Sequence, residues 1–306
     1  MSYSREFKTA LYSLDGVGVK KYHQTLKILK KHEVEESDFW VNRHNIWQKL
    51  PFNQKIEKSI YFFKKENDSY SYFEKNREKN VRVVFEEDKE YPFLLKELEL
   101  GPPLLFVKGN KLKVNKPLAM IGTRKITSYG HSVIRYLLSS ISKEISIISG
   151  FMYGTDVNAQ AQALGYGMKT VGILGFGFDH IYPAHHKKIM NSFLEKGATF
   201  ISPFAPHVYP RPGSFIVRDK IVAAMSQATC VIEVAPKSGS LFTAKTSINL
   251  GKKTWVIPVS IFSSFAKGLK ELADCGASLL SDVDDINSFF QIKKTSSVGK
   301  YLPDGV

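Results

Sequence analysis

The sequence predicts an α/β fold, with a doubly wound, mostly parallel sheet and a small N-terminal helical domain. Three observations lead to this prediction. The chain has 306 residues, 43% of them hydrophobic, which is enough for a large core and a satellite domain. From residue 117 onward, short apolar runs alternate with amphipathic helical patterns. These runs are almost continuously apolar, as strands are when helices cover both faces of a parallel sheet.

The N-terminal part, residues 1–80, is expected to be a helical domain of the helix-hairpin-helix or SAM-like type. Apolar residues recur at spacings of three and four in FKTALYSL, KKYHQTLKILKKH and NQKIEKSIYFFKKEN. Between the first two patterns lies LDGVGVKK, residues 14–21, whose glycines allow a tight turn. Such a turn can also crowd backbone amides at a helix start and hold a phosphate of a nucleic-acid backbone. Both interpretations stay open here.

Residues 81–116 have a different character, a strand–helix–strand pattern formed by VRVVF, YPFLLKEL and PPLLFVKGN. We expect this connecting segment to pack on the domain that follows it. That domain, residues 117–290, is expected to be Rossmann-like, with strands at PLAMI, ISIIS, TVGILG, TFIS, TCVIEVA and TWVIPVS. GLKELADCGASLLSD adds a helix and an edge element. Residues 291–306 are polar and lack periodicity, so we expect a flexible tail.

The net charge points to a polyanionic partner. Lys and Arg number 43 against 29 Asp and Glu, which gives +14. Contacts between cations and phosphates release condensed counterions, so such an excess is typical of nucleic-acid binding. No apolar stretch is long enough to span a membrane, and MSYSREFKTA lacks the apolar segment of a signal peptide. We therefore expect a cytoplasmic protein with no membrane partner.

The two cysteines, Cys230 and Cys275, lie far apart without metal-ligand spacing, and both are expected to be small core residues. The carboxylates at the ends of strands form neither a paired acid–base motif nor a Ser-His-Asp arrangement. The histidines at 180, 185 and 186 lack a cysteine or carboxylate at ligand spacing. The Walker pattern is also absent. We predict no catalytic residue, no metal and no cofactor.

In an open parallel sheet, ligands bind beyond the carboxyl ends of the strands. The loops that follow the predicted strands, here called the strand-end loops, each offer glycines, a helix N-terminus or a cation. In MIGTRKITSYG, residues 120–130, an Arg-Lys pair stands where a dinucleotide loop keeps small residues. The candidate nucleic-acid-binding residues are Gly122, Thr123, Arg124, Lys125, Ser149, Gly150, Phe151, Gly154, Asp156, Gly175, Arg211, Phe215, Arg218, Lys220, Ser238, Gly239 and Ser240.

Cations combined with aromatic rings suit a single nucleic-acid strand better than one small nucleotide, because the rings can stack on unpaired bases. The rings available in these loops are those of Phe151, Tyr182 and Phe215. Each of them could instead be a core residue.

Taken in order, these segments resemble the DNA-processing protein A (DprA/Smf) family from about residue 10 to residue 290. The matching pieces are LDGVGVKK, YPFLLKEL with PPLLFVKGN, MIGTRKITSYG, SGFMYGTDVNAQAQAL, TVGILGFGFDHIYPAHH, residues 202–260 and GLKELADCGASLL. The resemblance implies a homodimer that binds single-stranded DNA without sequence preference and is not an enzyme. It also implies protection of incoming DNA and loading of RecA recombinase in natural transformation and recombination.

The resemblance also assigns particular residues. The family's Gly-Ser-Arg loop matches 122–124, which makes Arg124 the first candidate for a phosphate contact. Its Ser-Gly loop matches 149–150, with Gly154 and Asp156, and its Arg-Pro-Gly-x-Phe motif matches 211–215. The next family motif, Arg-Asn-Arg, is Arg218-Asp219-Lys220 here, so a carboxylate replaces the amide. Residues 238–240 match the last loop.

Two alternatives stay open. The first is a sensor or hydrolase of nucleotide derivatives on a related Rossmann-like fold. A phosphoribohydrolase of that kind would show Pro-Gly-Gly-x-Gly-Thr-x-x-Glu, and the corresponding segment here is Lys-Ser-Gly-Ser at 237–240 with no such Glu. The second is a DprA-like paralogue that acts in defence against foreign DNA, which sequence does not separate from a role in transformation.

Overall fold

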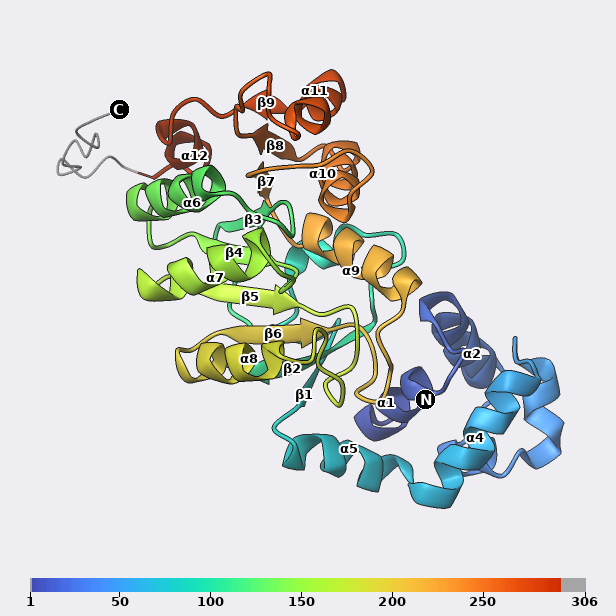
Figure 1. Ribbon diagram of the computed structural model, residues 1–306. Coiled ribbons are helices and arrows are strands. Elements are labelled where there is room, and N and C mark those ends of the chain that lie inside the picture. Colours follow the sequence, from blue (N-terminus) through green and yellow to red (C-terminus); the bar gives the residue numbers. More distant parts are fainter. Residues whose placement is uncertain (1, 293–306) are drawn as a thin grey trace. The chain divides into compact units, whose positions relative to one another are not determined.

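The computed structural model describes residues 2–292 (Figure 1). The predicted flexible tail, 291–306, therefore lies outside the described residues from position 293 onward. Within the described range, nine strands follow the order β1-β2-β6-β5-β4-β3-β7-β8-β9. Their bounds are β1 (Arg82–Phe85), β2 (Leu104–Gly109), β3 (Pro117–Ile121), β4 (Ser146–Ser149), β5 (Thr170–Ile173), β6 (Thr199–Ser202), β7 (Ala228–Val231), β8 (Lys253–Val256) and β9 (Ser278–Leu279).

The strand pairings confirm a mixed α/β fold with a mostly parallel sheet. β3 pairs in parallel with both β4 and β7, and β4–β5, β7–β8 and β8–β9 are also parallel. β1 and β2 are antiparallel, and so are β2 and β6. The expected edge element after the last long helix is β9, which is the last strand in the order.

The helices follow the predicted amphipathic patterns, with ends that differ by a few residues. YPFLLKEL forms only a short 3-10 helix, η2 (Phe93–Glu97), because Pro92 and Leu98 on either side are extended. No helix in residues 2–292 is long and apolar enough to cross a bilayer. The helices are α1 (Arg5–Ser13), α2 (Val19–Lys31), α3 (Glu36–Trp40), η1 (Arg43–Lys49), α4 (Gln54–Glu66), α5 (Ser69–Glu78), α6 (Ser128–Ser140), α7 (Thr155–Gly165), α8 (His186–Glu195), α9 (Pro212–Ala224), α10 (Gly239–Asn249), α11 (Ala266–Asp274) and α12 (Asp284–Phe289).

The chain divides into two compact units. The first comprises the described residues up to Leu112 together with Leu174–Leu194 and Thr199–Arg218. The second comprises Lys113–Ile173, Glu195–Ala198 and the described residues from Asp219 onward. These units differ from the domains predicted at 1–80, 81–116 and 117–290, and those boundaries stay predictions.

The helices at the start of the first unit pack around an aromatic core. Phe7 of α1 and Phe39 of α3 are fully buried, with ring centroids 5.2 Å apart in an edge-to-face arrangement. Burial of such rings supplies most of the stability of a small helical cluster. Arg5 of α1 binds Asp88 through two hydrogen bonds of 2.7 and 2.8 Å and also donates to the carbonyl of Val83. Helix α1 is thereby fixed to the turn that follows β1.

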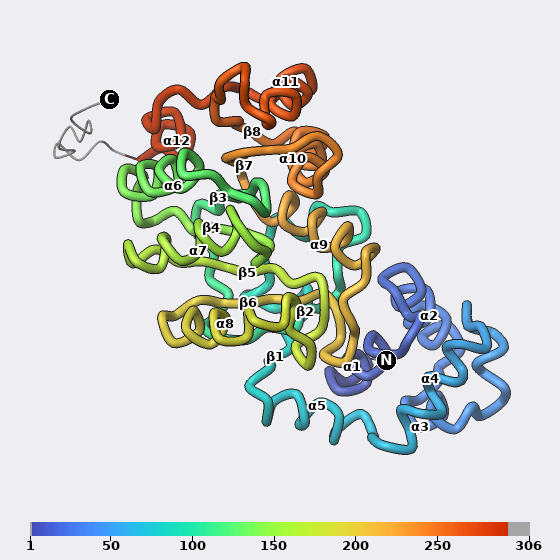
Figure 2. Tube along the Cα trace, viewed as in Figure 1, coloured from blue at the N-terminus to red at the C-terminus, as the bar shows by residue number. Residues whose placement is uncertain are grey.

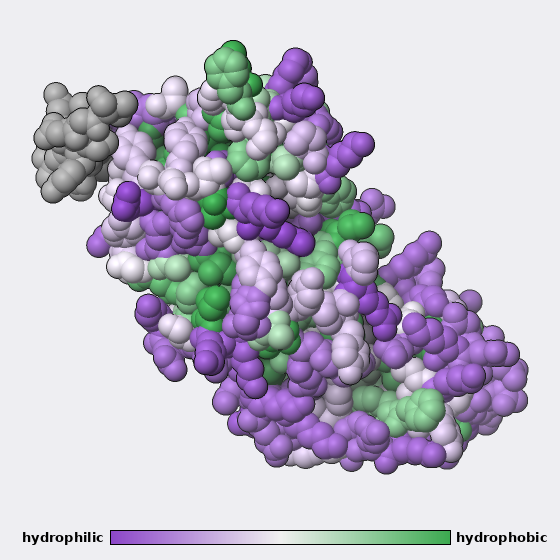
Figure 3. Space-filling view, in the orientation of Figure 1, coloured by the Kyte–Doolittle hydropathy of each residue, from purple (hydrophilic) through white to green (hydrophobic). Residues whose placement is uncertain are grey.

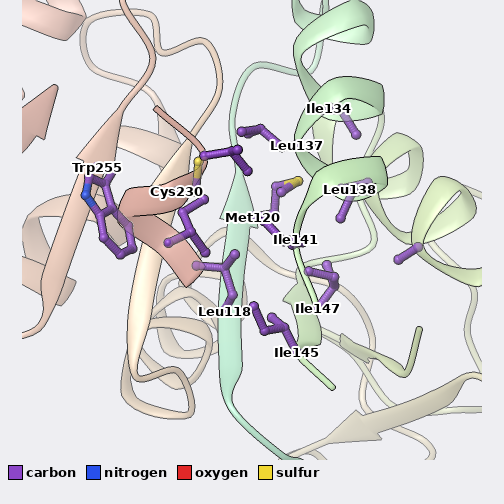
Figure 4. Packing of buried hydrophobic residues seen from close by; sticks show 14 of the residues in the cluster. Leu118, Met120, Ile134, Leu137, Leu138, Ile141, Ile145, Ile147, Cys230 and Trp255 are labelled. Atoms are coloured by element: carbon purple, nitrogen blue, oxygen red, sulfur yellow. The ribbon is translucent and has the colours of Figure 1, made fainter. Parts of the chain in front are cut away.

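The core of the second unit surrounds β3, all of whose residues are buried. Figure 4 shows Leu118 and Met120 of β3 with side chains of α6 on one side and of β7 and β8 on the other. Figure 2 shows α6 and α7 side by side, and Asn158 and His131 form a hydrogen bond of 2.7 Å between these two helices. The neighbours labelled in Figure 4 are Ile134, Leu137, Leu138, Ile141, Ile145, Ile147, Cys230 and Trp255.

The two cysteines differ in their surroundings. Cys230 in β7 is fully buried, and burial raises the pKa of its thiol to about 12. The expectation of a core residue is correct for this cysteine. It is wrong for Cys275, which is exposed, because this residue follows the last turn of α11 at a helix end.

Candidate nucleic-acid interface

The sheet has a topological switch point in the second unit. Strand β3 has β4 on one side and β7 on the other, so the chain winds in opposite directions from β3. Ligands of open α/β sheets bind outside the carboxyl ends of the strands at such a point. The residues that follow β3, β4 and β7 are therefore the first place to look for a binding site.

Gly122 marks the place where the three loops after these strands meet. A Cβ atom at this position would lie 2.5 Å from Oγ1 of Thr155 and 2.9 Å from the carbonyl oxygen of Glu233. Thr155 begins α7, and both its amide and its hydroxyl lie 3.1 Å from the carbonyl oxygen of Thr123, to which they donate. We call this contact among Gly122, Thr123, Thr155 and Glu233 the three-loop junction. It holds the loop after β3 against the start of α7.

Gly154 completes the packing of the loop after β4 on the loop after β3. Its φ of 74° and ψ of −121° are accessible to glycine and strongly disfavoured for other residues. A Cβ atom here would overlap the carbonyl oxygen of Thr123 and would lie 2.6 Å from the carbonyl carbon of Arg124. Only glycine lets these two backbone segments approach so closely.

The junction presents two cations. Arg124 and Lys125 follow directly from Thr123 and are exposed, and the amide of Lys125 donates to Oγ1 of Thr123 at 3.1 Å. Lys237, after β7, is also exposed. Within residues 2–292, none of these three side chains forms an ion pair with another residue. Their charge is therefore available to an anion from outside the chain.

A buried carboxylate organises the start of α6. Glu233 is 3% exposed and accepts hydrogen bonds from the amide and the hydroxyl of Thr127, at 3.0 and 2.5 Å. Thr127 in turn caps α6 by accepting from the amide of Gly130. The pKa of Tyr129 is raised, first by burial and then by the nearby charge of Glu233. Glu233 is thus fully engaged with the backbone and hydroxyl of the loop that carries Arg124.

The start of α10 lies in the same unit. Ser238 is its N-cap and accepts from the amide of Leu241 at 3.2 Å, while its hydroxyl also contacts Ser240 at 3.0 Å. A Cβ atom on Gly239 would lie 3.3 Å from a carboxylate oxygen of Asp219. The carboxylate that departs from the family motif therefore lies beside the helix start that is predicted to contact DNA.

A second cluster of predicted residues lies in the first unit. Ser214 accepts from the amide of Arg211 at 3.1 Å and contacts the carbonyl oxygen of Gly175 at 2.5 Å. The ring of Phe215 rests on Gly175, where a Cβ atom would lie 2.7 Å from the ring. The guanidinium of Arg218 lies 5.6 Å from the centroid of the Phe215 ring. Arg211 itself is exposed.

The predicted residues fall into two groups by burial. The exposed or half-buried members are Gly122, Thr123, Arg124, Lys125, Gly154, Arg211, Phe215, Lys220 and residues 238–240. The buried members of the predicted set are Ser149, Gly150, Phe151, Asp156, Gly175 and Arg218.

Three of the buried residues have evident structural partners or surroundings. Ser149 donates to the carbonyl of Met120 at 2.7 Å, and Asp156 accepts from the amide of Met152 at 3.2 Å. Phe151 has a φ of 56° and is 1% exposed. The core interpretation therefore holds for Phe151, and its ring is not presented for stacking. Tyr182, at 42% exposure and 5.6 Å from the Phe215 ring, remains accessible.

Sequence reasoning missed the residues that hold the loops together. Thr127 and Thr155 precede or begin a helix, a position where a hydroxyl commonly caps free amides, so their role could have been inferred. Glu233 stands at a strand end, but nothing in the sequence indicates that its partner is 106 residues away. Among residues 2–292, no group of three His, Cys, Asp or Glu side chains is arranged to hold a metal ion.

Comparison with known proteins identifies the family. The model of the family described as DNA recombination-mediator protein A matches residues 82–291, which is more than half of the chain. The chain belongs to this family. The family's DNA processing protein DprA of Bacillus subtilis is 30% identical over 213 residues, which cover 69% of this chain and 71% of that protein. DprA of Streptococcus pneumoniae is 30% identical over 205 residues, 67% and 72% of the two chains.

Solved structures of the same family have the same fold. The X-ray structure of the Streptococcus pneumoniae protein aligns with a TM-score of 0.75 and 23% identity, covering 94% of this chain and 98% of that one. The DNA processing protein A of Helicobacter pylori, whose structure concerns its single-stranded DNA binding mode, aligns with a TM-score of 0.61 and 26% identity. That alignment covers 69% of this chain and 96% of the other. The family membership implied by the sequence motifs is confirmed, and with it a DprA-type role in DNA processing.

Proposed function

We propose that this protein binds single-stranded DNA through its strand-end loops, protects incoming DNA and loads RecA recombinase in transformation and recombination. The observation that carries the proposal is the pair of exposed cations Arg124 and Lys125, which have no ion-pair partner within residues 2–292 and follow the three-loop junction at the switch point. A related protein from Helicobacter pylori binds single-stranded DNA, which supports the same partner here.

The physical basis is contact with phosphate. A guanidinium can donate two parallel hydrogen bonds to one phosphate, and such charge-assisted bonds are about twice as strong as neutral ones. The junction stabilises the backbone beside Arg124 before any ligand arrives, so little ordering is needed on binding. In the first unit, Arg211 offers a further cation, and Phe215 and Tyr182 offer rings on which bases can stack.

The proposal includes a non-enzymatic role. Glu233, the buried carboxylate of the three-loop junction, accepts hydrogen bonds from the amide and hydroxyl of Thr127 in the loop that carries Arg124. We also propose that the protein acts in the cytoplasm as a homodimer. The alternatives, a sensor or hydrolase of nucleotide derivatives and a paralogue acting in defence, are outcomes that the experiments below separate from the main proposal.

The test is fluorescence anisotropy with labelled single-stranded oligonucleotides of several sequences across a salt series. Arg124→Ala should weaken binding equally for all sequences and reduce the slope of log K against log salt by about 0.7, the value for one phosphate on a single strand. Arg135→Ala is the matched control, because this arginine is also exposed but lies within α6, away from the loop.

Three results would contradict the proposal. Equal affinity and slope for Arg124→Ala and the unmodified chain would remove Arg124 from the interface. Efficient competition by an unlabelled mononucleotide would favour the small-nucleotide alternative. Binding that supports no RecA filament on oligonucleotides coated with a single-strand-binding protein would remove the loading role and leave DNA binding intact.

A further inference from the structure

Helix α2 in the first unit carries a basic stripe that the single-strand interface does not use. Its lysines at 20, 27, 30 and 31, here called the α2 stripe, are all exposed. Lys27 lies seven residues after Lys20, and Lys30 and Lys31 lie three and four residues after Lys27, so all four lie on one side of the helix. Tyr22, Thr25 and Leu29 occupy the opposite side and are buried. The surface over α2 is correspondingly hydrophilic in Figure 3.

Within residues 2–292, no carboxylate neutralises the stripe by an ion pair. Helix α2 contains no Asp or Glu, and none of the stripe lysines forms an ion pair in the part of the chain that the structure describes. Lys27 lies three and four residues before Lys30 and Lys31, so these like charges repel one another along the helix. Other lysines of this unit, such as the half-buried Lys8 and the exposed Lys79, have carboxylate partners at 2.7 Å.

The start of α2 is also unusual for a helix. Lys20 and Lys21 lie in the first turn, where positive charge opposes the helix dipole, and no acidic residue is present there. The N-cap Gly18 supplies no side-chain hydrogen bond, and no other atom would lie within 4 Å of a Cβ placed on it. In contrast, α1 and α4 each have a side-chain cap and a glutamate in the first turn. An external anion bound at the start of α2 would offset the unfavourable interaction of these two lysines with the helix dipole.

The turn before α2 brings one more cation to this end of the stripe. Gly16 has a φ of 94°, and a Cβ atom there would lie 3.9 Å from Cδ of Lys55 at the start of α4. The single carboxylate of this turn, Asp15, is directed to His207, with 3.8 Å between Oδ1 and Nε2. Lys55 therefore adds a positive charge beside the turn that precedes α2, and Glu57 follows it in the first turn of α4.

The geometry favours a long anion with closely spaced charges. From residue 20 to residue 31 the helix rises about 17 Å, whereas double-stranded DNA carries one charge per about 1.7 Å of its axis. Tyr22 is 3% exposed, so the exposed ring on this helix is the imidazole of His23, and α2 presents no Phe, Tyr or Trp ring on which unpaired bases could stack. We propose that the α2 stripe binds the phosphate backbone of double-stranded DNA. This inference does not depend on the single-strand interface.

The test compares the full chain with a variant that changes Lys20, Lys27, Lys30 and Lys31 to Gln. Anisotropy is measured with a labelled duplex of about two helical turns and, separately, with a single-stranded oligonucleotide across a salt series. We expect duplex affinity to fall by on the order of 10- to 100-fold and the salt slope to fall by about 3.6, which corresponds to four phosphates on a duplex. Single-strand affinity should stay within about two-fold.

The matched control changes four other exposed lysines to Gln and so alters net charge equally, at positions 143, 187, 188 and 196. It should leave duplex binding near that of the unmodified chain. If circular dichroism shows that the fourfold variant is unfolded, the double variant Lys20→Gln with Lys27→Gln replaces it in the test. This double variant should reduce the salt slope for the duplex by about 1.8.

Several results would overturn the inference. Unchanged duplex affinity in the stripe variant, or no duplex binding by the unmodified chain, would exclude this partner. An equal loss in the control variant would indicate a general charge effect. A parallel loss of single-strand binding would place the stripe in the single-strand interface, and stripe-dependent sedimentation with phosphatidylserine vesicles without duplex binding would indicate a membrane surface.

Discussion

Replacing Gly154 with alanine should disturb both stability and DNA binding. An L-residue with this positive φ costs about 1–2 kcal/mol. The added Cβ would meet the backbone of Thr123 and Arg124, which cannot move aside as a side chain can, so overpacking adds about 1–3 kcal/mol. The free energy of unfolding should therefore fall by about 2–5 kcal/mol.

Relief of this strain requires the loop after β3 to move away from α7. Arg124 would then lose its position, and loss of one charge-assisted hydrogen bond of about 1.5–3 kcal/mol weakens Kd for single-stranded DNA by about ten-fold or more. Urea unfolding gives the stability and fluorescence anisotropy gives the affinity, both measured on the purified full chain.

Gly165→Ala is the control, because Gly165 ends the same helix and no atom would lie within 4 Å of its Cβ. This substitution should leave stability unchanged or raise it by up to about 1 kcal/mol. If Gly154→Ala matches Gly165→Ala in both measurements, the three-loop junction does not constrain Arg124, and the reasoning is refuted.

Two further predictions concern pH and thiol chemistry. The hydrogen bonds from Arg5 lower the pKa of Asp88 in the folded chain. Their contribution to the free energy of unfolding is therefore fully present above the ordinary carboxylate pKa of about 3.9. It is lost as the pH falls through the lowered pKa of the folded state. Asp88→Asn should therefore reduce the free energy of unfolding by about 1 kcal/mol at pH 7, a small value because Arg5 is partly exposed. The difference in stability between this variant and the unmodified chain should shrink towards about pH 3. A difference that stays constant with pH would contradict this prediction. Maleimide should modify Cys275 rapidly in the native chain and Cys230 only in denaturant, as followed by mass spectrometry, and native labelling of both would show that β7 opens readily.

The sequence was sufficient to predict the strands and the loops that follow them, for identifiable reasons. Runs such as PLAMI are apolar on both faces, which determines burial whatever the neighbours are. The position of Arg124 after β3 follows from chain order alone. Its approach to Gly154 does not, because that contact depends on the conformations of two loops separated by 30 residues of sequence.

The burial of Phe151 and of Arg218 was not predicted, because it depends on the local backbone conformation. Phe151 points into the core because its backbone has a positive φ, which the sequence of a glycine-rich loop does not specify. Arg218 is 4% exposed because the phase of α9 places it beside Phe215. A shift of one residue in that phase would have placed it in solvent, and hydrophobic periodicity does not predict helix phase so precisely at a helix start.

The three-loop junction limits how this interface can be exchanged between relatives. Gly122, Thr155 and Glu233 come from segments far apart in the sequence, yet each occupies space or accepts hydrogen bonds that the others define. A loop transplanted alone from another member of the family would arrive without its matching neighbours and would leave a buried carboxylate or a carbonyl without its donor. Grafts of this surface should therefore succeed only when all three segments are transferred together.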